Sequence, residues 1–351
     1  MVDEEKKSLT TSLLRCALTP ASQIFALFVA LRGWGYSSGL RKISRLDLPV
    51  VSIGNLAVGG TGKTPFTICL ARDLASLRVA ILSRGYRCDL EREAAPRLVG
   101  RGGATLFPPS YMGDEPTLMT HHLPAALSIV GPDRVAGGRL AIQEGAQLIL
   151  LDDGMQHRRL YRDIEVVLIN RGDVQGGRAL PRGSLREPLT ALRRADYLVS
   201  ADMGGESDAI QKSLSRYTSA GLIGTALQPT QVKGQLALSL DELKGKKVAL
   251  FCGIASPQRF VSQAVSLGAH PVVKLVLPDH KLAPLHPNHP FIKEAVARGA
   301  ELLLCTEKDW VKYDSKIDLG LPLAYLEVEM AVTSGKSAYS ELLARCFALS
   351  N

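Results

Sequence analysis

One stretch of the chain decides its fold, and it reads Val50-Val51-Ser52-Ile53-Gly54-Asn55-Leu56-Ala57-Val58-Gly59-Gly60-Thr61-Gly62-Lys63-Thr64-Pro65. Its first residues are apolar and mostly β-branched, which predicts a buried strand. After Gly62-Lys63-Thr64, apolar residues recur with helical spacing at Phe66, Ile68, Leu70, Ala71 and Leu74. A strand, a glycine-rich turn and a helix with Gly-Lys-Thr at the junction form the context of a phosphate-binding P-loop.

The residues expected to contact phosphate are Ala57, Val58, Gly59, Gly60, Thr61, Gly62, Lys63 and Thr64. Glycines let backbone N–H groups approach phosphate oxygens, and the helix N-terminus adds about half a positive charge. Lys63 is expected to reach the β- and γ-phosphates, and the Thr64 hydroxyl to bind Mg²⁺. Ala57 stands where the usual pattern has glycine, so Gly59 and Gly60 would supply the conformational freedom. The alternative is a glycine-rich turn that contains Gly-Lys-Thr by accident.

The composition is that of an ordinary globular protein, with 351 residues, 46% hydrophobic and 22% charged, enough for about two domains. The net charge of +8 suits phosphate ligands, nucleic acid or an anionic membrane, and does not separate them. Aromatic residues are only 5% and no sustained basic block occurs, so we expect no nucleic-acid partner. None of the six cysteines forms a Cys-x-x-Cys pair, which predicts buried thiols without disulfides or zinc.

Near the N-terminus, residues 24–31 form an apolar run that is too short for a membrane span of about 20 residues. The acidic start of the chain and the missing cleavage pattern argue against a signal peptide. Two alternatives remain: a helix packed on the body of the protein, or a helix in a membrane interface with Trp34 and Tyr36 at headgroup level. The basic residues that flank the run favour the interfacial alternative, and they are Arg15, Arg32, Arg41, Lys42 and Arg45.

Apolar strand candidates alternate with helical stretches along the chain. They lie at residues 79–83, 127–130, 147–153, 166–169 and 197–199, with a helix at 133–144. A second α/β unit has strands at 248–252, 271–276 and 302–305, with helices at 257–267 and 291–298. This order predicts an α/β fold of the P-loop NTPase type, with a mostly parallel sheet and helices on both faces. A polar, turn-rich stretch at about 204–235 indicates a boundary before a smaller C-terminal α/β domain.

Carboxylates mark two further places. Asp152 and Asp153 end the predicted strand at 147–153, where P-loop enzymes hold Mg²⁺; a helix cap or turn is the alternative. Asp114 lies in Gly113-Asp114-Glu115-Pro116 before an apolar helical run, where it serves either as a functional carboxylate or as a helix N-cap. His280 follows Asp279 in a predicted loop, although a lone histidine is more often structural.

A series of short motifs follows the P-loop in order: Ser83-Arg84-Gly85-Tyr86, Gly113-Asp114-Glu115-Pro116, Asp133-Arg134, Leu151-Asp152-Asp153-Gly154-Met155-Gln156-His157-Arg158, Leu180-Pro181, Leu185-Arg186-Glu187-Pro188, Phe251-Cys252-Gly253-Ile254, Pro278-Asp279-His280 and Thr306-Glu307-Lys308-Asp309. Together with the P-loop they cover roughly residues 48 to 313, and the chain resembles the tetraacyldisaccharide 4′-kinase family, the lipid A kinases of Gram-negative bacteria. Met155 stands where that family more often has Phe. Lys281 stands where a second His is common, so any role for a second imidazole is unfilled.

The resemblance implies an enzyme that transfers the γ-phosphate of ATP, with Mg²⁺, to the 4′-hydroxyl of lipid A disaccharide 1-phosphate, forming lipid IVA. By the same resemblance, Lys63 acts on the phosphates, Asp114 accepts the sugar hydroxyl proton, and His280 assists or orients Asp114. The implied metal-side groups are Thr64, Asp152 and Asp153. Arg186 and Glu187 are implied active-site groups without an assigned role.

The implied substrate bears on the N-terminal run. Burial of an acyl chain is worth about 0.8 kcal/mol per CH₂, so a glycolipid with several chains does not leave the bilayer. We therefore expect a peripheral enzyme on the cytoplasmic face of the bacterial inner membrane, with the glycolipid and the membrane surface as partners. The expected domains are 1–46, an amphipathic membrane-interface helical segment; 47–215, a P-loop kinase domain; and 216–351, the smaller α/β domain. The alternatives are a P-loop kinase or ligase of a soluble metabolite, and a regulatory P-loop ATPase.

Overall fold

The computed structural model describes residues 18–86, 88–201 and 212–350. The first part of the predicted N-terminal segment, with Arg15 and Cys16, lies outside these ranges, as does the start of the predicted boundary at 204–211. The chain divides into two compact units. Unit 1 combines Met1–Lys63, Ile142–Ala226 and Val332–Asn351, and unit 2 combines Thr64–Ala141 and Leu227–Ala331. We describe each unit by itself.

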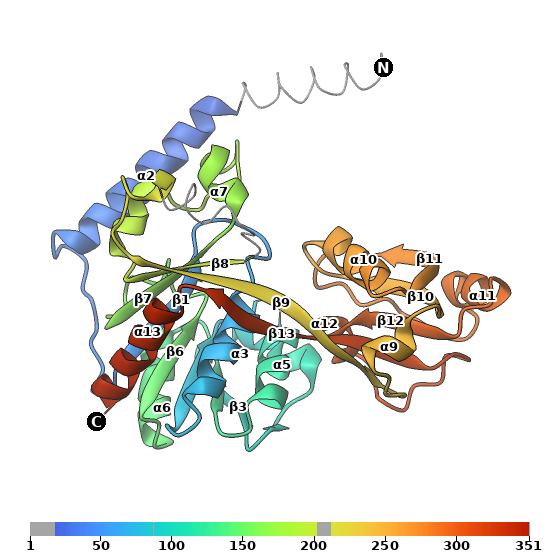
Figure 1. The fold of residues 1–351 in the computed structure, drawn as a ribbon. Helices are drawn as coiled ribbons and strands as arrows, with labels where there is room; N and C mark the ends of the chain where they lie inside the picture. The colour runs from blue at the N-terminus through green and yellow to red at the C-terminus, as the bar shows by residue number, and fades with distance from the viewer. Residues whose placement is uncertain (1–17, 87, 202–211, 351) are drawn as a thin grey trace, which may run out of the picture. The chain divides into compact units, whose positions relative to one another are not determined.

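Unit 1 contains a parallel sheet with the strand of the predicted P-loop inside it (Figure 1). Strand β1 (Val50–Asn55) pairs with β6 (Leu148–Asp152) on one side and with β7 (Ile164–Ile169) on the other. Strands β8 (Tyr197–Ala201) and β9 (Gly221–Gly234) extend the sheet beyond β7. Every residue of β1, β6 and β7 is buried, as expected for a parallel sheet covered on both faces. The register Ile53↔Asp152 brings the carboxyl ends of β1 and β6 to one edge.

Helices of unit 1 pack on this sheet and around its loops. They are α2 (Thr19–Ser37), the short α7 (Arg171–Gly176), the 3₁₀ helix η2 (Leu189–Arg194) and α13 (Lys336–Ser350). The Tyr197 hydroxyl of β8 donates a 2.9 Å hydrogen bond to Glu341, and Arg345 lies 3.2 Å from Asp196, so α13 is tied to β8 by polar contacts. Helix α3 (Lys63–Asp73) begins where the glycine-rich loop ends.

The N-terminal half of unit 2 continues the alternation of strands and helices. Strands β2 (Val79–Ser83) and β5 (Leu127–Val130) are parallel neighbours, and β3 (Arg97–Arg101) and β4 (Ala104–Thr105) follow in antiparallel pairing. The helical elements here are η1 (Asp89–Arg92), α4 (Pro109–Met112), α5 (Asp114–His122) and α6 (Arg134–Gln143). Helix α5 therefore starts inside the Gly-Asp-Glu-Pro motif.

The C-terminal half of unit 2 has β10 (Lys247–Cys252) between its parallel neighbours β11 (His270–Val276) and β12 (Leu302–Thr306), and β12 also pairs with β13 (Leu323–Ser334). Its helices are α9 (Leu240–Leu243), α10 (Pro257–Ser266), α11 (Pro290–Ala297) and α12 (Glu307–Trp310). Successive side chains of β10 enter two different apolar clusters, Leu250 in one and Phe251 in the other. The alternation shows that both faces of β10 are buried.

These elements confirm the predicted α/β class, and the expected strands at 79–83 and 127–130 coincide with β2 and β5. Two long strands were not predicted. The fourteen-residue β9 occupies the C-terminal part of the stretch that was interpreted as a boundary, and β13 follows the last predicted strand. The three-part domain division remains a prediction. Among the described residues, none of the helices is both long enough and apolar enough to cross a bilayer.

Candidate active site

Lys63, the first residue of α3, has its ammonium group held by two oxygen atoms of unit 1. Its Nζ atom donates a 3.1 Å hydrogen bond to Oδ1 of Asn55 and lies 3.5 Å from Oδ1 of Asp153. Asn55 is fully buried at the end of β1, and its Nδ2 atom donates to the Ala57 carbonyl at 2.7 Å. One carboxamide therefore connects the strand end, the start of the glycine-rich loop and the lysine that follows the loop.

The glycine-rich loop uses backbone angles that other residues adopt at a cost. Gly59 has φ of 119° and Gly62 has φ of 84°, which glycine reaches without a Cβ clash. Thr61, between them in sequence, is buried, and its hydroxyl has no hydrogen-bond partner in the described part of the chain. Buried hydroxyls are normally satisfied, so this one is available to an oxygen-rich ligand.

Asp153 is kept ionised by two cations. Its Oδ2 atom lies 2.9 Å from Nη1 of Arg186, and its Oδ1 atom is the one in contact with Lys63. Burial alone would raise the pKa of Asp153, but Lys63 and Arg186 hold that pKa below its ordinary value. The neighbouring Asp152 is buried and ends β6. The predicted strand-end pair is thus in place, and Asp153 is the member in contact with Lys63.

Gln156 joins the other groups at this edge of the sheet. Its Nε2 atom donates to the Asn55 carbonyl at 3.0 Å and lies 3.2 Å from Oε1 of Glu187, while its Oε1 accepts from Arg186 at 3.2 Å. Glu187 in turn pairs with Arg194 at 2.9 Å. Arg186 and Glu187, which the sequence left without a role, therefore support Asp153 and Gln156. Gln156 itself belonged to a motif quoted above, but nothing in its local pattern indicated this position.

Helix α2 is attached to the same part of unit 1. Arg32 donates to the Gln156 carbonyl at 3.0 Å, and Arg158 donates to the Gly33 carbonyl at 2.7 Å. Farther along, the Ser22 hydroxyl donates to the Ala179 carbonyl at 2.7 Å. The alternative in which this helix packs on the body of the protein is therefore confirmed for one of its faces.

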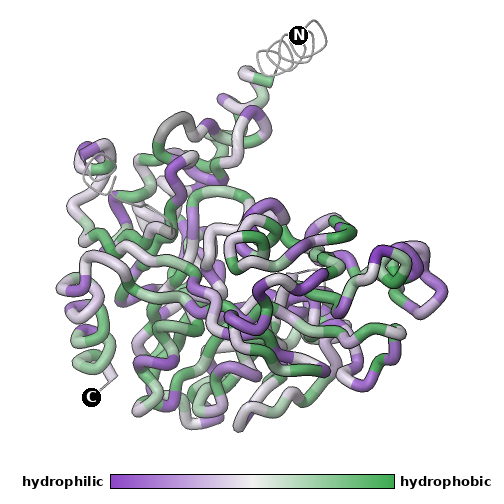
Figure 2. The backbone as a smooth tube through the Cα atoms, turned by 45° about the vertical axis from the view of Figure 1, so that its right-hand side comes forward, coloured by the Kyte–Doolittle hydropathy of each residue, from purple (hydrophilic) through white to green (hydrophobic). Residues whose placement is uncertain are grey.

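The opposite face of α2 is apolar and exposed. Its large side chains are between 57% and 69% exposed, and they are Ile24, Leu27, Phe28, Leu31 and Trp34. At about 100° per residue, these five positions fall within an arc of about 120°. Residues 24–31 of this helix are all hydrophobic, and Figure 2 colours the backbone on that hydropathy scale. We call these five residues the α2 stripe.

Within unit 2, the structure brings Asp114 and His280 together across 166 residues of sequence. The Nδ1 atom of His280 lies 3.2 Å and 3.1 Å from the two carboxylate oxygens of Asp114. Gly113 is the N-cap residue of α5, and Asp114 is its first helical residue, so the N-cap alternative for Asp114 is wrong. The Oδ1 atom of Asp114 also accepts the backbone N–H of Glu115 at 3.0 Å.

Two lysines of unit 2 surround this pair. Lys312 Nζ lies 3.7 Å from Oδ2 of Asp114, and Lys308 Nζ lies 3.3 Å from Nε2 of His280. Burial would raise the pKa of Asp114, but the hydrogen bond with His280 and the charges of Lys308 and Lys312 hold it below its ordinary value. The carboxylate is therefore ionised and faces an imidazole. Neither lysine was assigned a role from the sequence.

The loop that carries His280 is fixed by Gly253. The His280 N–H donates to the Gly253 carbonyl at 3.1 Å, and the Gly253 N–H donates to Oδ2 of Asp309 at 3.0 Å. A Cβ atom on Gly253 would lie 2.8 Å from the Lys281 carbonyl. The Thr306 hydroxyl donates to the same Oδ2 atom of Asp309 at 2.6 Å. Three of the motifs quoted above thus converge on the backbone of one histidine.

Asp153 and His280 share an unusual backbone conformation. Among the described residues that are not glycine, they are the two with positive φ, 53° and 65°. Such conformations cost about 1–3 kcal/mol and concentrate at functional sites, where the surrounding structure imposes them. Both residues were site candidates from the sequence.

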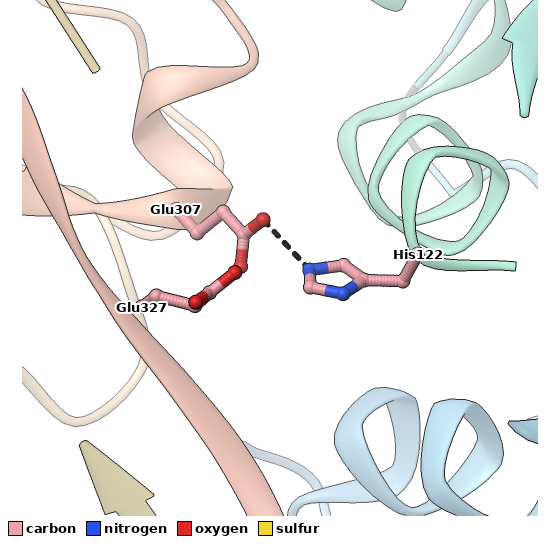
Figure 3. Close-up of side chains that lie close together, drawn as sticks. All are labelled: His122, Glu307 and Glu327. Carbon is pink, nitrogen blue, oxygen red and sulfur yellow. Dashed lines mark hydrogen bonds and ion pairs between the residues drawn. The ribbon is translucent and has the colours of Figure 1, made fainter. Parts of the chain in front are cut away.

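A third cluster in unit 2 has the ligand types of a metal site. His122, Glu307 and Glu327 place ligand atoms within 4.8 Å of one another (Figure 3). His122 Nε2 lies 2.7 Å from Oε1 of Glu307, but both oxygens of Glu327 already accept bonds from three donors: Lys233, Gln231 and Thr230. A cation would have to displace the Lys233 ammonium, so we interpret the cluster as an ion-pair network.

The predicted residues therefore form two groups, one in each unit. Lys63 lies with Asp153 in unit 1, beside the edge where Asp152 ends β6. Asp114 lies with His280 in unit 2. Thr64 is the second residue of α3, where the Gly-Lys-Thr pattern places it.

A glycine-rich loop between a buried parallel strand and a helix, with its lysine beside a strand-end carboxylate, defines the P-loop nucleotide-binding class. Within that class the chain belongs to the Tetraacyldisaccharide-1-P 4'-kinase family, whose family model matches residues 14–347. The predicted family and the predicted kinase class are confirmed.

Relatives match this chain over about nine tenths of its length. The Tetraacyldisaccharide 4'-kinase of Syntrophus aciditrophicus is 37% identical over 338 residues, covering 90% of each chain. That of Geobacter sulfurreducens is 36% identical over 324 residues, covering 91% of this chain and 90% of the relative. Among solved structures, the "apo" form of LpxK from Aquifex aeolicus in complex with ATP matches with a TM-score of 0.79 at 30% identity. That match covers 95% of this chain and 99% of the other.

Proposed function

We propose that the chain transfers the γ-phosphate of ATP to the 4′-hydroxyl of lipid A disaccharide 1-phosphate, forming lipid IVA. The observation that carries the proposal is the placement of Lys63 by Asn55 and Asp153 at the P-loop of a chain from a kinase family. The solved relative at 30% identity is a complex with ATP, which supports ATP as the phosphate donor.

On the phosphate side, the loop supplies backbone N–H groups and Lys63 supplies a positive charge. Thr64, Asp152 and Asp153 offer a hydroxyl and carboxylates, the hard oxygen ligands that suit Mg²⁺, and the lowered pKa of Asp153 keeps that carboxylate ionised. A magnesium ion bound there would neutralise charge on the phosphates. Arg186 contacts one carboxylate oxygen of Asp153 and Lys63 contacts the other, which limits the movement of that side chain.

On the acceptor side, Asp114 accepts the proton of the sugar hydroxyl, and His280 orients the Asp114 carboxylate. A carboxylate with a lowered pKa is a weak base. Phosphoryl transfer passes through a loose transition state in which orientation and charge matter more than early proton removal. A weak but oriented acceptor that is ionised before the reaction suits that requirement.

The α2 stripe would hold the enzyme at the lipid surface where its substrate resides. The exposed, apolar stripe lies on a helix that is fixed to unit 1 by Arg32 and Arg158. Arg41, Lys42 and Arg45 follow the helix and are exposed, and each well-placed cation adds about 1 kcal/mol toward anionic lipid. We infer peripheral attachment at the cytoplasmic face of the bacterial inner membrane.

The test is transfer of label from γ-³²P-ATP to lipid A disaccharide 1-phosphate in mixed micelles. Labelled glycolipid, dependent on Mg²⁺, is the expected result. ATP binding with transfer only to a soluble acceptor would favour the metabolite kinase or ligase. ATP turnover that needs an added protein partner, with unlabelled glycolipid, would favour the regulatory ATPase.

A further inference from the structure

We propose that Lys308 is a positioning residue that fixes the tautomer of His280, so that Nδ1 carries the hydrogen and donates it to Asp114. The proposal rests on the proposed function, because it concerns the group that orients the proton acceptor of that reaction. Its geometric basis lies entirely within unit 2.

The direction of the hydrogen bonds follows from what each group can do. An ammonium group has only hydrogens to offer, so the Lys308 Nζ atom, 3.3 Å from Nε2 of His280, requires a lone pair on Nε2. A neutral imidazole with a lone pair on Nε2 carries its hydrogen on Nδ1. That nitrogen faces the carboxylate of Asp114 at 3.1 Å.

The other tautomer meets repulsion at both ends. It would direct the Nε2 hydrogen at the Lys308 ammonium and the Nδ1 lone pair at the ionised carboxylate of Asp114. The lost donor would also leave Asp114 without the hydrogen bond that aligns it, and a net hydrogen bond to a charged group is a substantial interaction. Lys308 therefore determines which ring nitrogen of His280 carries the hydrogen.

Lys308 is itself anchored for this task. Its Nζ atom lies 3.1 Å from Oε1 of Glu115 and 3.7 Å from Oδ1 of Asp279. Burial would lower the pKa of Lys308, but Glu115, Asp114 and Asp279 hold it above its ordinary value, so the side chain stays a cation. Helix α12, which carries Lys308, packs against α5, which carries Glu115 and Asp114.

The charged groups around His280 come from three elements. Asp114 faces Nδ1, Lys308 faces Nε2, and Asp279 of the same loop lies 3.7 Å from Nε2. The Tyr86 ring packs edge-on against the imidazole of His280, with 5.8 Å between the two ring centroids. Lys312 lies against Asp114 and Asp309 and not between Lys308 and the imidazole, so it provides a second buried lysine beside the same carboxylate.

The tautomer is read directly from the ¹⁵N chemical shifts of His280 in the full-length protein at about pH 8, where the imidazole of an ordinary histidine is neutral. A His280→Gln spectrum assigns the signal among the seven histidines. We expect the Nδ1–H tautomer in the parent protein and in Lys312→Met, and a mixture or the Nε2–H tautomer in Lys308→Met. An Nε2–H tautomer in the parent protein overturns the proposal without any variant, as does an unchanged tautomer in folded Lys308→Met.

Kinetics supply the second measurement. Lys308→Met is expected to lower kcat by about 10- to 100-fold, the size of one lost charge-assisted hydrogen bond, with KM for ATP unchanged. Lys308→Arg, which keeps a charged donor, is expected to restore most of kcat. Equal loss in both variants would mean that the side chain acts only through packing. Because the NMR arm needs no glycolipid, failure of the proposed function leaves the tautomer assignment testable by itself.

Discussion

Arg32 of α2 donates a 3.0 Å hydrogen bond to the backbone carbonyl of Gln156. The Gln156 side chain contacts the Asn55 carbonyl, and the Asn55 side chain in turn holds Lys63. A continuous series of hydrogen bonds therefore runs from the helix with the exposed apolar stripe to the P-loop lysine. The surface proposed to meet lipid and the group proposed to meet phosphate are therefore linked through Gln156 and Asn55.

The first prediction concerns that helix. Replacing Phe28 and Leu31 by Asp should weaken association with anionic lipid vesicles by at least about tenfold, because burying each large apolar side chain is worth about 1.5–3 kcal/mol. Co-sedimentation with vesicles measures the effect. Val276→Asp with Val296→Asp is the matched control, since both valines are about as exposed, at 51% and 53%. Equal loss in the control pair would mean that the α2 stripe has no special part in membrane binding.

The second prediction concerns Lys63. Lys63→Ala should lower phosphate transfer by about 10³-fold or more, because the side chain provides the positive charge at the phosphates. Label transfer to the glycolipid measures it. Lys233→Ala, which also removes an ion-paired lysine but from the Glu327 network, should keep near-normal transfer. Near-normal transfer by Lys63→Ala would contradict the assignment of the P-loop.

The pattern of apolar residues was sufficient to predict the elements around the P-loop. Strands β2 and β5 are short, mostly apolar runs, and segments with the spacing of helices lie between such runs. The bounds of both strands match the prediction. Strand β9 was missed because it is only partly buried and contains Gly224, Pro229 and Gly234, residues that locally indicate turns. Pairing of its backbone with β8, which is distant from the local signal, makes this segment a strand.

The site also contains residues that the local sequence predicts and contacts that it does not. Lys63 and Asp153 were predicted because each lies in a recognisable local pattern, a glycine-rich loop and a strand end. The contact of Asp114 with His280 joins residues 166 positions apart, and the Lys308 contact joins α12 to the His280 loop. No local spacing encodes such contacts. Family resemblance paired Asp114 with His280, but the position of Lys308 required the fold.

The third prediction concerns the acceptor pair. Asp114→Asn should lower kcat by about 10²- to 10⁴-fold while leaving ATP affinity nearly unchanged, because the carboxylate acts on the hydroxyl and not on the nucleotide. His280→Gln should cost less, since the imidazole only orients the carboxylate. Steady-state kinetics with both variants, and ATP binding by calorimetry, measure these effects. A larger loss in His280→Gln than in Asp114→Asn would reverse the two roles.

The fourth prediction uses the lowered pKa of Asp114. Its ionised form is favoured in the folded state, so its stabilising contribution is present above the ordinary carboxyl value of 3.8 and is lost as the pH falls through the lower folded-state value. The Asp114→Asn variant should therefore lose less stability than the parent protein as the pH is lowered below about 4. Thermal unfolding against pH measures it. Asp241→Asn removes an exposed pair with Lys244, so any effect there should disappear in high salt.

The fifth prediction concerns Gly253, which supports His280 through backbone contacts alone. In Gly253→Ala the new Cβ atom would lie 2.8 Å from the Lys281 carbonyl and 3.2 Å from Oδ1 of Asp309, so the loop must move. We expect a loss of about 1–3 kcal/mol in the free energy of unfolding and a fall in kcat, with ATP affinity kept.

Gly172→Ala is the matched control for that variant. Gly172 is exposed in α7, and a Cβ atom there meets nothing within 4 Å. Because alanine favours a helix over glycine, the control should be as stable as the parent protein or slightly more so, with full activity. Chemical unfolding and label transfer compare the two. If Gly253→Ala kept full kcat while losing stability, the backbone of the His280 loop would not need its present position for phosphate transfer, and Gly253 would serve only the packing of unit 2.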